Sequence, residues 1–388
     1  MRVIHITTVP KTLFFLCGQA AFLRDHGFEM HVVSSPGDDL DTFASQEKVV
    51  SHAIPMRRAI SPLQDLITVF RLWKLFRRLK PRVVHSHTPK GGLLGMIAST
   101  LARTPVRVYH VHGLPLVTSH GLRRSLLWLT ERVSCLLATR VFCVSRSVRE
   151  LAISLRLVSP SHMSVLANGS INGVDAEVRF RPSRENQSSG MAVRARCGIS
   201  ADAPVVGFVG RIVRDKGVLE LAQAWSILRE RFPMAHLLMV GAEEAQDPVP
   251  PVVMRNLRAD PRVHLVGHDR DTPPYFSAMD VLALPTYREG FVVTALEAAA
   301  MEVPVVGTNV PGCVDAVVEA ETGTVIPARD PGALAEALAR YIADPGLRRR
   351  HGTQGRARVL RDYSPELIWR ALLPVYSGGP HHSVQVKA

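Results

Sequence analysis

The chain has 388 residues, of which 46% are hydrophobic and 21% charged, as is typical of a globular α/β protein long enough for two domains. No apolar run approaches the roughly 20 residues that a membrane-spanning helix needs, and Met1–Thr8 is typical of a first strand rather than a signal peptide. The formal net charge of +13 lies entirely in residues 1–190, which hold 25 Lys and Arg against 12 Asp and Glu.

Strand and helix patterns alternate along the first half. The strand patterns are Val3–Thr7, Met30–Ser34, Val83–Ser86, Arg107–His112, Arg140–Val144 and Ser164–Ala167. Helical patterns separate most of them, at Phe14–His26, Leu63–Leu79, Leu93–Ala102, Leu122–Ala138 and Ser147–Leu155. This alternation predicts parallel βαβ units and a doubly wound sheet.

Two of these helices are basic as well as amphipathic. Leu63–Leu79 carries Arg71, Lys74, Arg77 and Arg78 between its apolar positions, and Leu122–Arg140 carries Arg123, Arg124 and Arg132. Either could lie on a membrane surface or pack its apolar stripe on the sheet. The basic excess favours an anionic surface, and the lack of any helix-turn-helix, zinc-finger or RNP-type pattern favours phospholipid over nucleic acid.

A second alternating set runs from Val205 to about Ala343, after the polar, breaker-rich stretch Arg181–Gly190. That stretch predicts a linker or an exposed loop, and the tail Gly378–Ala388 is expected to be frayed. Five scattered cysteines without a C-x-x-C pair indicate reduced thiols in the cytosol rather than disulfides or a zinc site.

Two glutamates eight positions apart, Glu289 and Glu297, follow the buried strand pattern Asp280–Pro285. The Ala/Leu-rich stretch from Phe291 predicts a helix, so Glu289 lies in the turn and Glu297 about two turns into the helix. A strand, a glycine turn and a helix N-terminus form an anion site. The two acids suit hydroxyl-rich groups on either side of that anion, although two surface glutamates would show the same spacing.

A second strand–loop–helix junction carries fixed cations. The run G-R-I-V-R-D-K-G at Gly210–Gly217 follows the apolar run Val205–Val209 and precedes a helical pattern at Val218–Arg231. Arg211 offers a planar fork and Lys216 a mobile point charge, so the pair suits a diphosphate. The alternative is a solvated basic loop.

Together these motifs resemble the retaining glycosyltransferases of family 4, whose C-terminal domain carries G-R-x(4)-K-G followed by E-x(7)-E. The resemblance extends over nearly the whole chain. It includes the motif runs at Val83–Gly95, Tyr109–Leu114, Asn168–Asp175 and Gly312–Val317. It is strongest to the members that extend lipid-linked oligosaccharides for capsule, exopolysaccharide or lipopolysaccharide.

The resemblance implies a GT-B architecture, with two Rossmann-like domains facing a cleft and ligands outside the carboxyl ends of the strands. The expected divisions are an acceptor domain at 1–180, a linker at 181–200, a nucleotide-sugar domain at 201–362, a helix crossing back at 363–377 and a flexible tail at 378–388. The expected catalytic residues are His112 and Glu289, and the expected donor-binding residues are Arg211, Lys216, Gly267, Gly290, Phe291, Val292, Val293 and Glu297. Among these, Arg211 and Lys216 would hold the diphosphate, Glu297 the ribose, and Glu289 the sugar.

The acceptor side would come from the first domain, where His85, His87, His110 and His112 crowd two strand ends. Histidine is the commonest general base, and a lone one is more often structural. By resemblance, His112 matches the family's active-site histidine, which positions the donor sugar rather than acting as a firm base. His87, Lys90 and Gly18 are further acceptor-side candidates.

Some positions depart from the family pattern. The first strand–helix loop has Gly18 alone where many members have a glycine pair, and Val292 stands where glycine or proline is common. Asp39-Leu40-Asp41 and Asp269-Arg270-Asp271 fit a metal-binding D-x-D, but two-residue patterns arise by chance. Because Arg211 and Lys216 can neutralise a diphosphate, we expect no metal and no cofactor.

We therefore predict a retaining transferase that moves a hexose or N-acetylhexosamine from a nucleotide diphosphate, UDP above all, to a polyprenyl-diphosphate-linked saccharide. It would act in the bacterial cytoplasm, peripheral on the inner face of the membrane, without nucleic acid as a partner. Three alternatives stay open: a glycosyltransferase with a small or polymeric soluble acceptor, a nucleotide-sugar epimerase of the same fold, and a non-enzymatic basic protein that binds membrane or nucleic acid.

Overall fold

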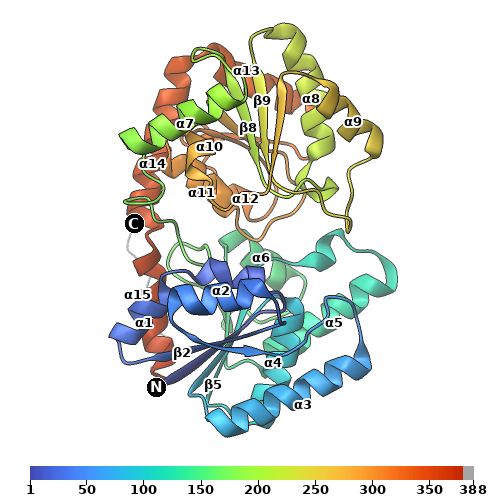
Figure 1. Ribbon diagram of the computed structural model, residues 1–388. Coiled ribbons are helices and arrows are strands. Elements are labelled where there is room, and N and C mark those ends of the chain that lie inside the picture. Colours follow the sequence, from blue (N-terminus) through green and yellow to red (C-terminus); the bar gives the residue numbers. More distant parts are fainter. Residues whose placement is uncertain (379–388) are drawn as a thin grey trace. The chain divides into compact units, whose positions relative to one another are not determined.

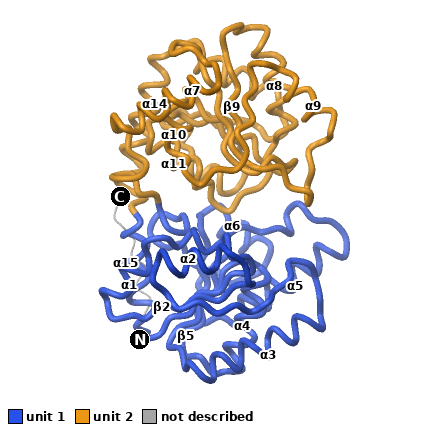
Figure 2. The backbone as a smooth tube through the Cα atoms, in the orientation of Figure 1, with its two compact units in different colours: residues 1–173, 365–388 blue, residues 174–364 orange. Residues whose placement is uncertain are grey.

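A computed structural model describes residues 1–378 and divides the chain into two compact units. Unit 1 comprises residues 1–173 together with the segment that begins at Pro365, and unit 2 comprises residues 174–364 (Figure 2). The chain thus leaves unit 1 after Gly173 and returns to it at Pro365. Within the described residues, no helix is both long enough and apolar enough to cross a membrane.

Unit 1 is built on a seven-stranded parallel sheet with the strand order β3-β2-β1-β4-β5-β6-β7 (Figure 1). The strands are β1 (Arg2–Ile6), β2 (Glu29–Ser34), β3 (Val50–Ala53), β4 (Val83–His87), β5 (Val106–Val111), β6 (Arg140–Cys143) and β7 (Met163–Val165). The order reverses between β1 and β4, as in a doubly wound fold.

The helices of unit 1 cover its sheet. They are α1 (Gln19–Asp25), α2 (Asp38–Glu47), α3 (Pro62–Leu79), α4 (Pro89–Leu101), α5 (Gly121–Leu137), α6 (Arg146–Ser154) and α15 (Pro365–Tyr376), with short 3-10 turns η1 (Pro10–Leu16) and η2 (Pro115–Thr118). Side chains of α3 and α4 bury against one face of the sheet, including Leu72, Phe76 and Leu94 against Ile4 and Val84. On the other face, α15 packs beside α1.

Unit 2 repeats the design with six parallel strands in the order β10-β9-β8-β11-β12-β13. They are β8 (Val205–Val209), β9 (His236–Val240), β10 (Val263–Gly267), β11 (Val281–Leu284), β12 (Val305–Thr308) and β13 (Gly323–Ile326). The helices are α7 (Arg184–Arg196), α8 (Val218–Arg231), α9 (Pro251–Ala259), α10 (Pro273–Ser277), α11 (Val293–Ala300), α12 (Cys313–Ala316), α13 (Pro331–Ala343) and α14 (Pro345–Asp362), with a 3-10 turn η3 (Arg214–Lys216).

The prediction of two doubly wound parallel sheets is confirmed, whereas several local predictions differ from the structure. The stretch expected to be a linker forms α7, which packs against α10 inside unit 2. Its side-chain cap at Ser183 starts a regular helix despite the polar sequence. The expected helix over 14–26 is instead a 3-10 turn and a short α-helix, separated by Gly18 with φ +81°. The expected tail lies outside the described residues, apart from Gly378.

Candidate active site

The two motif loops of unit 2 meet where the strand order reverses. β8 and β11 are neighbours in the sheet although β9 and β10 come between them in the chain. The Gly210–Gly217 loop leaves the carboxyl end of β8, and the loop with Glu289 leaves the carboxyl end of β11. Ligands of open parallel sheets bind at such a reversal point. Two motifs that are about 70 residues apart in the sequence therefore lie side by side in the fold.

Side chains and backbone tie these two loops together. Lys216 Nζ donates to a carboxylate oxygen of Glu289. Arg288 Nη2 lies 2.7 Å from the Asp215 carboxylate, and the Tyr287 N–H donates to the Asp215 carbonyl at 2.9 Å. The predicted cation and the predicted acid are thus direct partners, held by a network around Asp215.

Two glycines allow the loops to approach this closely. Gly217 has φ +71°, and a Cβ at this position would lie 1.8 Å from the carbonyl oxygen of Pro285, at the exit of β11. Gly312 has φ +80°, and its Cβ would lie 2.4 Å from the carbonyl oxygen of Gly290. A side chain at either position would push the loops of the site apart.

Glu297 lies on α11, which begins at Val293 rather than near Phe291, so this carboxyl is about one turn into the helix rather than two. Burial raises the pKa of Glu297 to about 7, and the charge of Arg179 acts in the opposite direction. A carboxyl group with a pKa of about 7 is partly protonated at neutral pH, so it can both donate hydrogen bonds to hydroxyl groups and accept them.

The loop before α11 is packed into unit 2. Phe291 and Val292 are buried, and Val293 is half-buried. The Val292 N–H donates to the Gly312 carbonyl at 3.4 Å and the Val293 N–H to the Phe291 carbonyl at 3.1 Å. The backbone N–H groups of Phe291, Val292 and Val293 were predicted to face a donor sugar. Those of Val292 and Val293 already donate to backbone carbonyls of unit 2.

The remaining donor-site candidates lie at neighbouring strand ends. The Arg211 guanidinium is half-exposed and contacts Glu244 at 2.9 Å. The Gly241 N–H donates to the Gly267 carbonyl at 2.7 Å, which joins the ends of β9 and β10, and Gly210 N–H donates to the Val240 carbonyl at 2.9 Å. Gly267 therefore stands at the same edge of the sheet as Arg211, two strands away.

In unit 1, sheet register places five histidines on one face. His5 on β1 pairs with His85 on β4, and His87 pairs with His110 on β5. Because side chains alternate between faces along a strand, His85 and His87 share a face, and His110 and His112 share it too. The sequence analysis singled out four of these residues but missed His5, whose pairing with His85 depends on which strands are neighbours.

Hydrogen bonds connect these histidines. The His5 Nδ1 to His87 Nε2 distance is 3.0 Å, and the His87 Nδ1 to His112 Nε2 distance is 2.9 Å. His85 contacts His110 at 3.3 Å and the hydroxyl of Tyr376 at 2.6 Å, with Tyr376 supplied by α15. Local sequence gave no signal for Tyr376, which is 291 positions from His85.

Burial keeps these imidazoles neutral. It lowers the pKa of His5 to about 3 and that of His112 to about 4. The pKa values of His85, His87 and His110 are well below the usual range, first because of burial and then because of the neighbouring histidines. At pH 7 His112 is therefore an uncharged donor and acceptor of hydrogen bonds.

The other acceptor-side candidates have structural partners. Lys90 forms a 2.8 Å ion pair with Asp65 on α3. Gly18 N–H donates to the Glu47 carboxylate at 3.0 Å, and a Cβ at Gly18 would lie 2.9 Å from the ring of Trp369. Both residues thus stabilise unit 1. The loops after β1 and β4, where the strand order reverses, are joined by a 2.9 Å hydrogen bond between the hydroxyls of Thr8 and Thr88. Neither threonine was predicted from the sequence as a site residue.

Metal-ligating geometry is found only in part of the histidine set, among the described residues. The nitrogens of His5, His85 and His87 lie within 4.8 Å of one another, as do those of His87, His110 and His112. Most of the nitrogens of these histidines already take part in hydrogen bonds, either with another of the five histidines or with Tyr376. The D-x-D aspartates lie elsewhere: Asp39 and Asp41 on α2, and Asp269 in a loop where it accepts bonds from Asp271 N–H and the Tyr275 hydroxyl. The expectation of no metal stays a prediction.

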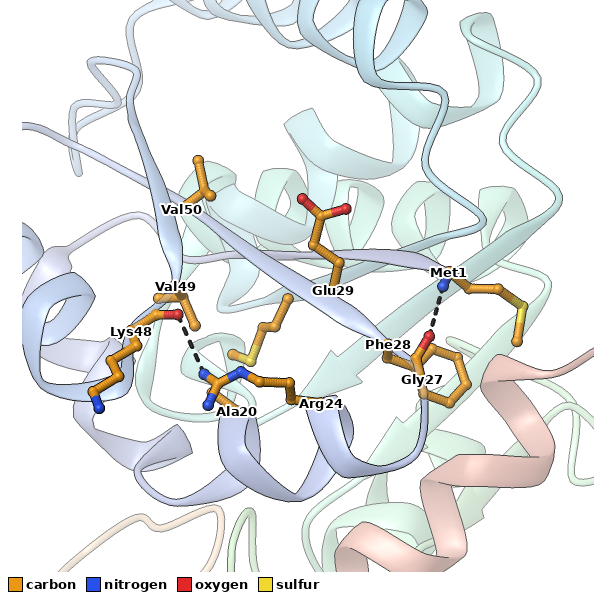
Figure 3. Close-up of a pocket in the computed structure, with 10 residues that line it drawn as sticks. Met1, Ala20, Arg24, Gly27, Phe28, Glu29, Lys48, Val49 and Val50 are labelled. Atoms are coloured by element: carbon orange, nitrogen blue, oxygen red, sulfur yellow. Dashed lines mark hydrogen bonds between the residues drawn. The ribbon is translucent and has the colours of Figure 1, made fainter.

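A pocket of about 340 Å³ lies away from these residues, at the amino ends of β1, β2 and β3 (Figure 3). Met1, Arg24, Glu29 and Lys48 are among the residues that line it, and Arg24 donates to the Lys48 carbonyl at 3.2 Å. Ligands of doubly wound sheets bind at the opposite, carboxyl edge. The pocket is therefore not the candidate site.

Comparisons with known proteins match both units. A family model described as "Glycosyl transferase 4-like domain" matches residues 15–169, and one described as "Glycosyl transferases group 1" matches residues 203–344. The chain is 35% identical over 376 residues to the capsular polysaccharide biosynthesis glycosyltransferase CapM of Staphylococcus aureus, covering 97% of each chain.

Two further proteins extend the comparison. The chain is 27% identical to the Escherichia coli UDP-Gal:alpha-D-GlcNAc-diphosphoundecaprenol alpha-1,3-galactosyltransferase, over 84% of this chain and 83% of that one. The crystal structure of Anabaena HepE in complex with UDP-glucose superposes with a TM-score of 0.81 at 20% identity, covering 97% of this chain and 100% of that chain. At that identity the structure supports the fold, which is GT-B.

Proposed function

Because this chain belongs to the group 1 glycosyltransferases, we propose that it transfers a hexose or N-acetylhexosamine from a UDP-sugar to a lipid-linked saccharide. Its N-terminal part matches the glycosyl transferase 4-like domain. The transfer would retain the configuration at the anomeric carbon. The product would serve bacterial capsule or a related surface polysaccharide. The relatives from S. aureus and E. coli support the pathway and the lipid-diphosphate acceptor, and HepE supports UDP as the nucleotide.

One observation carries the donor side of this proposal: Lys216 and Glu289 are direct partners at the strand-order reversal of unit 2. In our proposal the diphosphate displaces this pair, so that Lys216 contacts phosphate oxygens together with Arg211. The freed Glu289 then accepts hydrogen bonds from sugar hydroxyls. As the bond between the anomeric carbon and the diphosphate oxygen breaks, the two cations stabilise the charge that builds up on the leaving group.

Glu297 and Gly267 complete the proposed donor site. Glu297, with its raised pKa, would bind the ribose hydroxyls, and the peptide at Gly267 would contact the base at the neighbouring strand end. The Phe291 amide would face the sugar. His112, in unit 1, would position the donor sugar as an uncharged group, and His87 would support it. No resident metal or cofactor is required in this proposal.

The membrane side of the proposal rests on exposed apolar residues in α3 and α5, both of which pack beside α4. On α3, Leu63 is 81% exposed and Phe70 59% exposed, and on α5 Leu122 is 91% exposed. The exposed basic residues nearby are Arg71, Lys74, Arg77, Arg78, Arg123 and Arg124. Apolar side chains flanked by exposed cations suit a surface of anionic lipid.

Not every apolar side chain of α3 contributes to this surface. Phe76 is 1% exposed and belongs to the core of unit 1, so it cannot insert into a membrane. Leu66 is 69% exposed and Ile67 52%, so the exposed apolar stripe lies in the first half of α3. The remainder of the apolar stripe packs on the unit as a sheet-covering helix should.

The experiment that tests the function is a transfer assay with a panel of UDP-sugars and two acceptors, undecaprenyl-diphosphate-linked N-acetylglucosamine and a water-soluble analogue. We expect transfer to the lipid-linked acceptor, and we expect NMR of the product to show the same anomeric configuration as in the donor sugar. Transfer only to the soluble acceptor would favour that alternative. Interconversion of a UDP-sugar without an acceptor would favour an epimerase.

A further inference from the structure

The buried histidines of unit 1 and Tyr376 form one continuous chain of hydrogen bonds. It runs from His112 through His87 and His5 to the Tyr376 hydroxyl, then through His85 to His110. Its five links measure 2.9, 3.0, 3.4, 2.6 and 3.3 Å in that order. We call these six residues the histidine chain. Tyr376 is its central member and is fully buried.

We propose that Tyr376 is a positioning residue that fixes the tautomer of His112 through this chain, so that His112 presents a bare Nδ1, a hydrogen-bond acceptor for a hydroxyl group of the substrate. The inference rests on the proposed function for the role of the substrate, but the tautomer itself can be measured without any substrate.

The direction of the chain follows from counting protons. A neutral imidazole has one N–H and one lone pair, and a phenol has a single proton. A ring that donates through one nitrogen must therefore accept through the other. The phenol oxygen could accept from both His5 and His85, but its own buried proton would then have no acceptor among the described residues. Two arrangements leave every link with one donor and one acceptor: all five histidines carry the proton on Nε2, or all five carry it on Nδ1.

The contact between Tyr376 and His85 selects between these arrangements. Its 2.6 Å length is shorter than bonds donated by N–H groups and falls in the range of bonds donated by hydroxyls. The Tyr376 proton therefore points to His85 Nδ1. His5 must then donate from Nε2 to the phenol oxygen, His87 from Nε2 to His5, and His112 from Nε2 to His87.

The opposite end of the chain weighs against this arrangement without reversing it. His110 Nε2 is buried with no hydrogen-bond partner among the described residues. In the proposed direction this atom carries the proton, and in the other it carries a lone pair. The His110 ring stands edge-on to Phe142, with 6.1 Å between the ring centroids, and an aromatic neighbour of this kind tolerates an N–H.

The neutrality of the rings supports the inference. Burial lowers the pKa of His5 to about 3 and that of His112 to about 4, so at pH 7 no member carries a second proton that would break the alternation. His112 lies just beyond β5 and is only partly buried, so its Nδ1 is the atom left for a ligand. A bare nitrogen attracts a hydroxyl and repels a phosphate oxygen, which assigns this end of the chain to a sugar.

The tautomers are read by long-range 1H–15N correlation spectra of 15N-labelled protein at pH 7, with His112 assigned by its loss in His112→Gln. In the wild type we expect His112, His87 and His5 to be protonated on Nε2. In Tyr376→Phe the His5 Nε2–H loses its acceptor, so these three rings should shift to the Nδ1-protonated form.

The matched control is Tyr109→Phe. Tyr109 is equally buried and donates to Glu131 at 2.6 Å from the opposite face of the same sheet, so its loss should leave the tautomers of the histidine chain unchanged. His85→Leu supplies a second variant should Tyr376→Phe fail to fold. It removes the acceptor of the phenol proton, which is then free to donate to His5 and should shift the same three rings.

Three results would overturn the inference. The first is a wild-type His112 protonated on Nδ1, the second is an unchanged spectrum in both Tyr376→Phe and His85→Leu, and the third is stoichiometric binding of added Zn²⁺ to the chain nitrogens. Activity gives a separate reading: Tyr376→Phe should lower kcat about tenfold, the change expected when one hydrogen bond to the substrate is lost, with UDP affinity unchanged. Failure of the wild type to transfer sugar would count against the proposed function and leave the tautomer measurement intact.

Discussion

Lys216 donates from Nζ to the carboxylate of Glu289, so the cation of one motif loop is held by the acid of the other. Their side chains are 24% and 12% exposed, and a pair this sheltered from water is stronger than a surface salt bridge. The pair keeps the site neutral until a ligand arrives. In the proposed donor site a diphosphate would compete with Glu289 for Lys216, and the following two predictions depend on that competition.

Removal of either donor-site cation should weaken UDP binding. Lys216→Ala deletes a charge-assisted contact to a diphosphate and leaves Glu289 unpaired, so we expect a loss of roughly 1.5–3 kcal/mol. Arg211→Ala should fall near the lower end, because the Arg211 side chain is 51% exposed. Isothermal titration calorimetry with UDP measures both. Arg231→Ala removes an exposed pair with Glu336 in the same unit and should change nothing; unchanged affinity in both test variants would refute the donor-site assignment.

Glu289→Gln should separate nucleotide binding from sugar transfer. The amide keeps the shape of the carboxyl but releases Lys216, so UDP affinity should be kept or increased. Transfer should fall about 10- to 100-fold, since each hydrogen bond from a sugar hydroxyl to an ionised carboxylate contributes roughly 1.5–3 kcal/mol. Calorimetry with UDP and steady-state transfer kinetics measure the two effects. A variant that loses UDP affinity and keeps its kcat would contradict the role proposed for Glu289.

The sequence predicted what depends on local pattern. Val205–Val209 and Val218–Arg231 appear in the structure with the predicted bounds, because an apolar run and a 3.6-residue periodicity are both short-range signals. The location of the Lys216 loop and the Glu289 loop at one edge was also accessible, because all parallel strands of such a sheet end at the same carboxyl edge. Their direct contact was not, because it requires β8 and β11 to be neighbours in the sheet. The helix that Ser183 caps was not predicted, because the composition of that stretch indicated a linker.

The contacts of the histidine chain could be predicted only in part from local sequence pattern. His85 and His87 are visibly two apart, but the pairing of His5 with His85 depends on which strands become neighbours. The contact of Tyr376 with His85 depends further on a terminal helix returning to unit 1. Likewise, an ion pair to Asp65 for Lys90 could not be read from T-P-K-G-G. Partners of this kind are set by tertiary structure, and no short motif encodes them.

Transfer should persist when divalent metal is removed. In the proposed donor site, Arg211 and Lys216 would supply the positive charge that a metal would otherwise give to the leaving diphosphate. Activity is measured after dialysis against a chelator and again after addition of magnesium or manganese. Complete loss that either metal restores would contradict the prediction, and Asp269→Asn and Asp39→Asn would then show whether a D-x-D pair is responsible.

The α3 surface should bind anionic vesicles in a salt-dependent way. Each Lys or Arg near the surface contributes about 1 kcal/mol, and salt weakens the attraction as the Debye length shortens to about 8 Å at physiological ionic strength. Neutralising Arg71, Lys74, Arg77 and Arg78 should abolish binding in a co-sedimentation series across salt. Leu63→Ser with Phe70→Ser should lower binding at every salt concentration, because it removes exposed apolar area.

The outcome with neutral vesicles distinguishes the two contributions. Equal binding to neutral and anionic vesicles would assign the interaction to apolar insertion by Leu63, Leu66, Ile67 and Phe70. Absence of binding to both would favour a soluble acceptor. Neutralising the exposed Arg349 and Arg350 of α14 in unit 2 is the control and should leave vesicle binding unchanged.

The contribution of Glu131 to the stability of unit 1 should fall as pH rises from 4.5 to about 7. This carboxyl is buried on α5, bonded to the Tyr109 hydroxyl at 2.6 Å, and burial raises its pKa from 4.5 to about 7. Between these values the folded state binds more protons than the unfolded state, so the free energy of unfolding decreases with pH. The stabilisation is complete below pH 4.5 and is lost by about pH 7, a difference of roughly 3 kcal/mol.

Glu131→Gln removes this titration while keeping an acceptor for the Tyr109 hydroxyl. The stability of Glu131→Gln relative to the wild type should therefore improve by roughly 3 kcal/mol between pH 5 and pH 8. The buried histidines, whose lowered pKa values add stability as pH rises toward 6.5, are common to both proteins and cancel in the difference. Urea unfolding at a series of pH values measures it. A profile for Glu131→Gln that does not change with pH would mean that this carboxyl ionises normally in the folded protein.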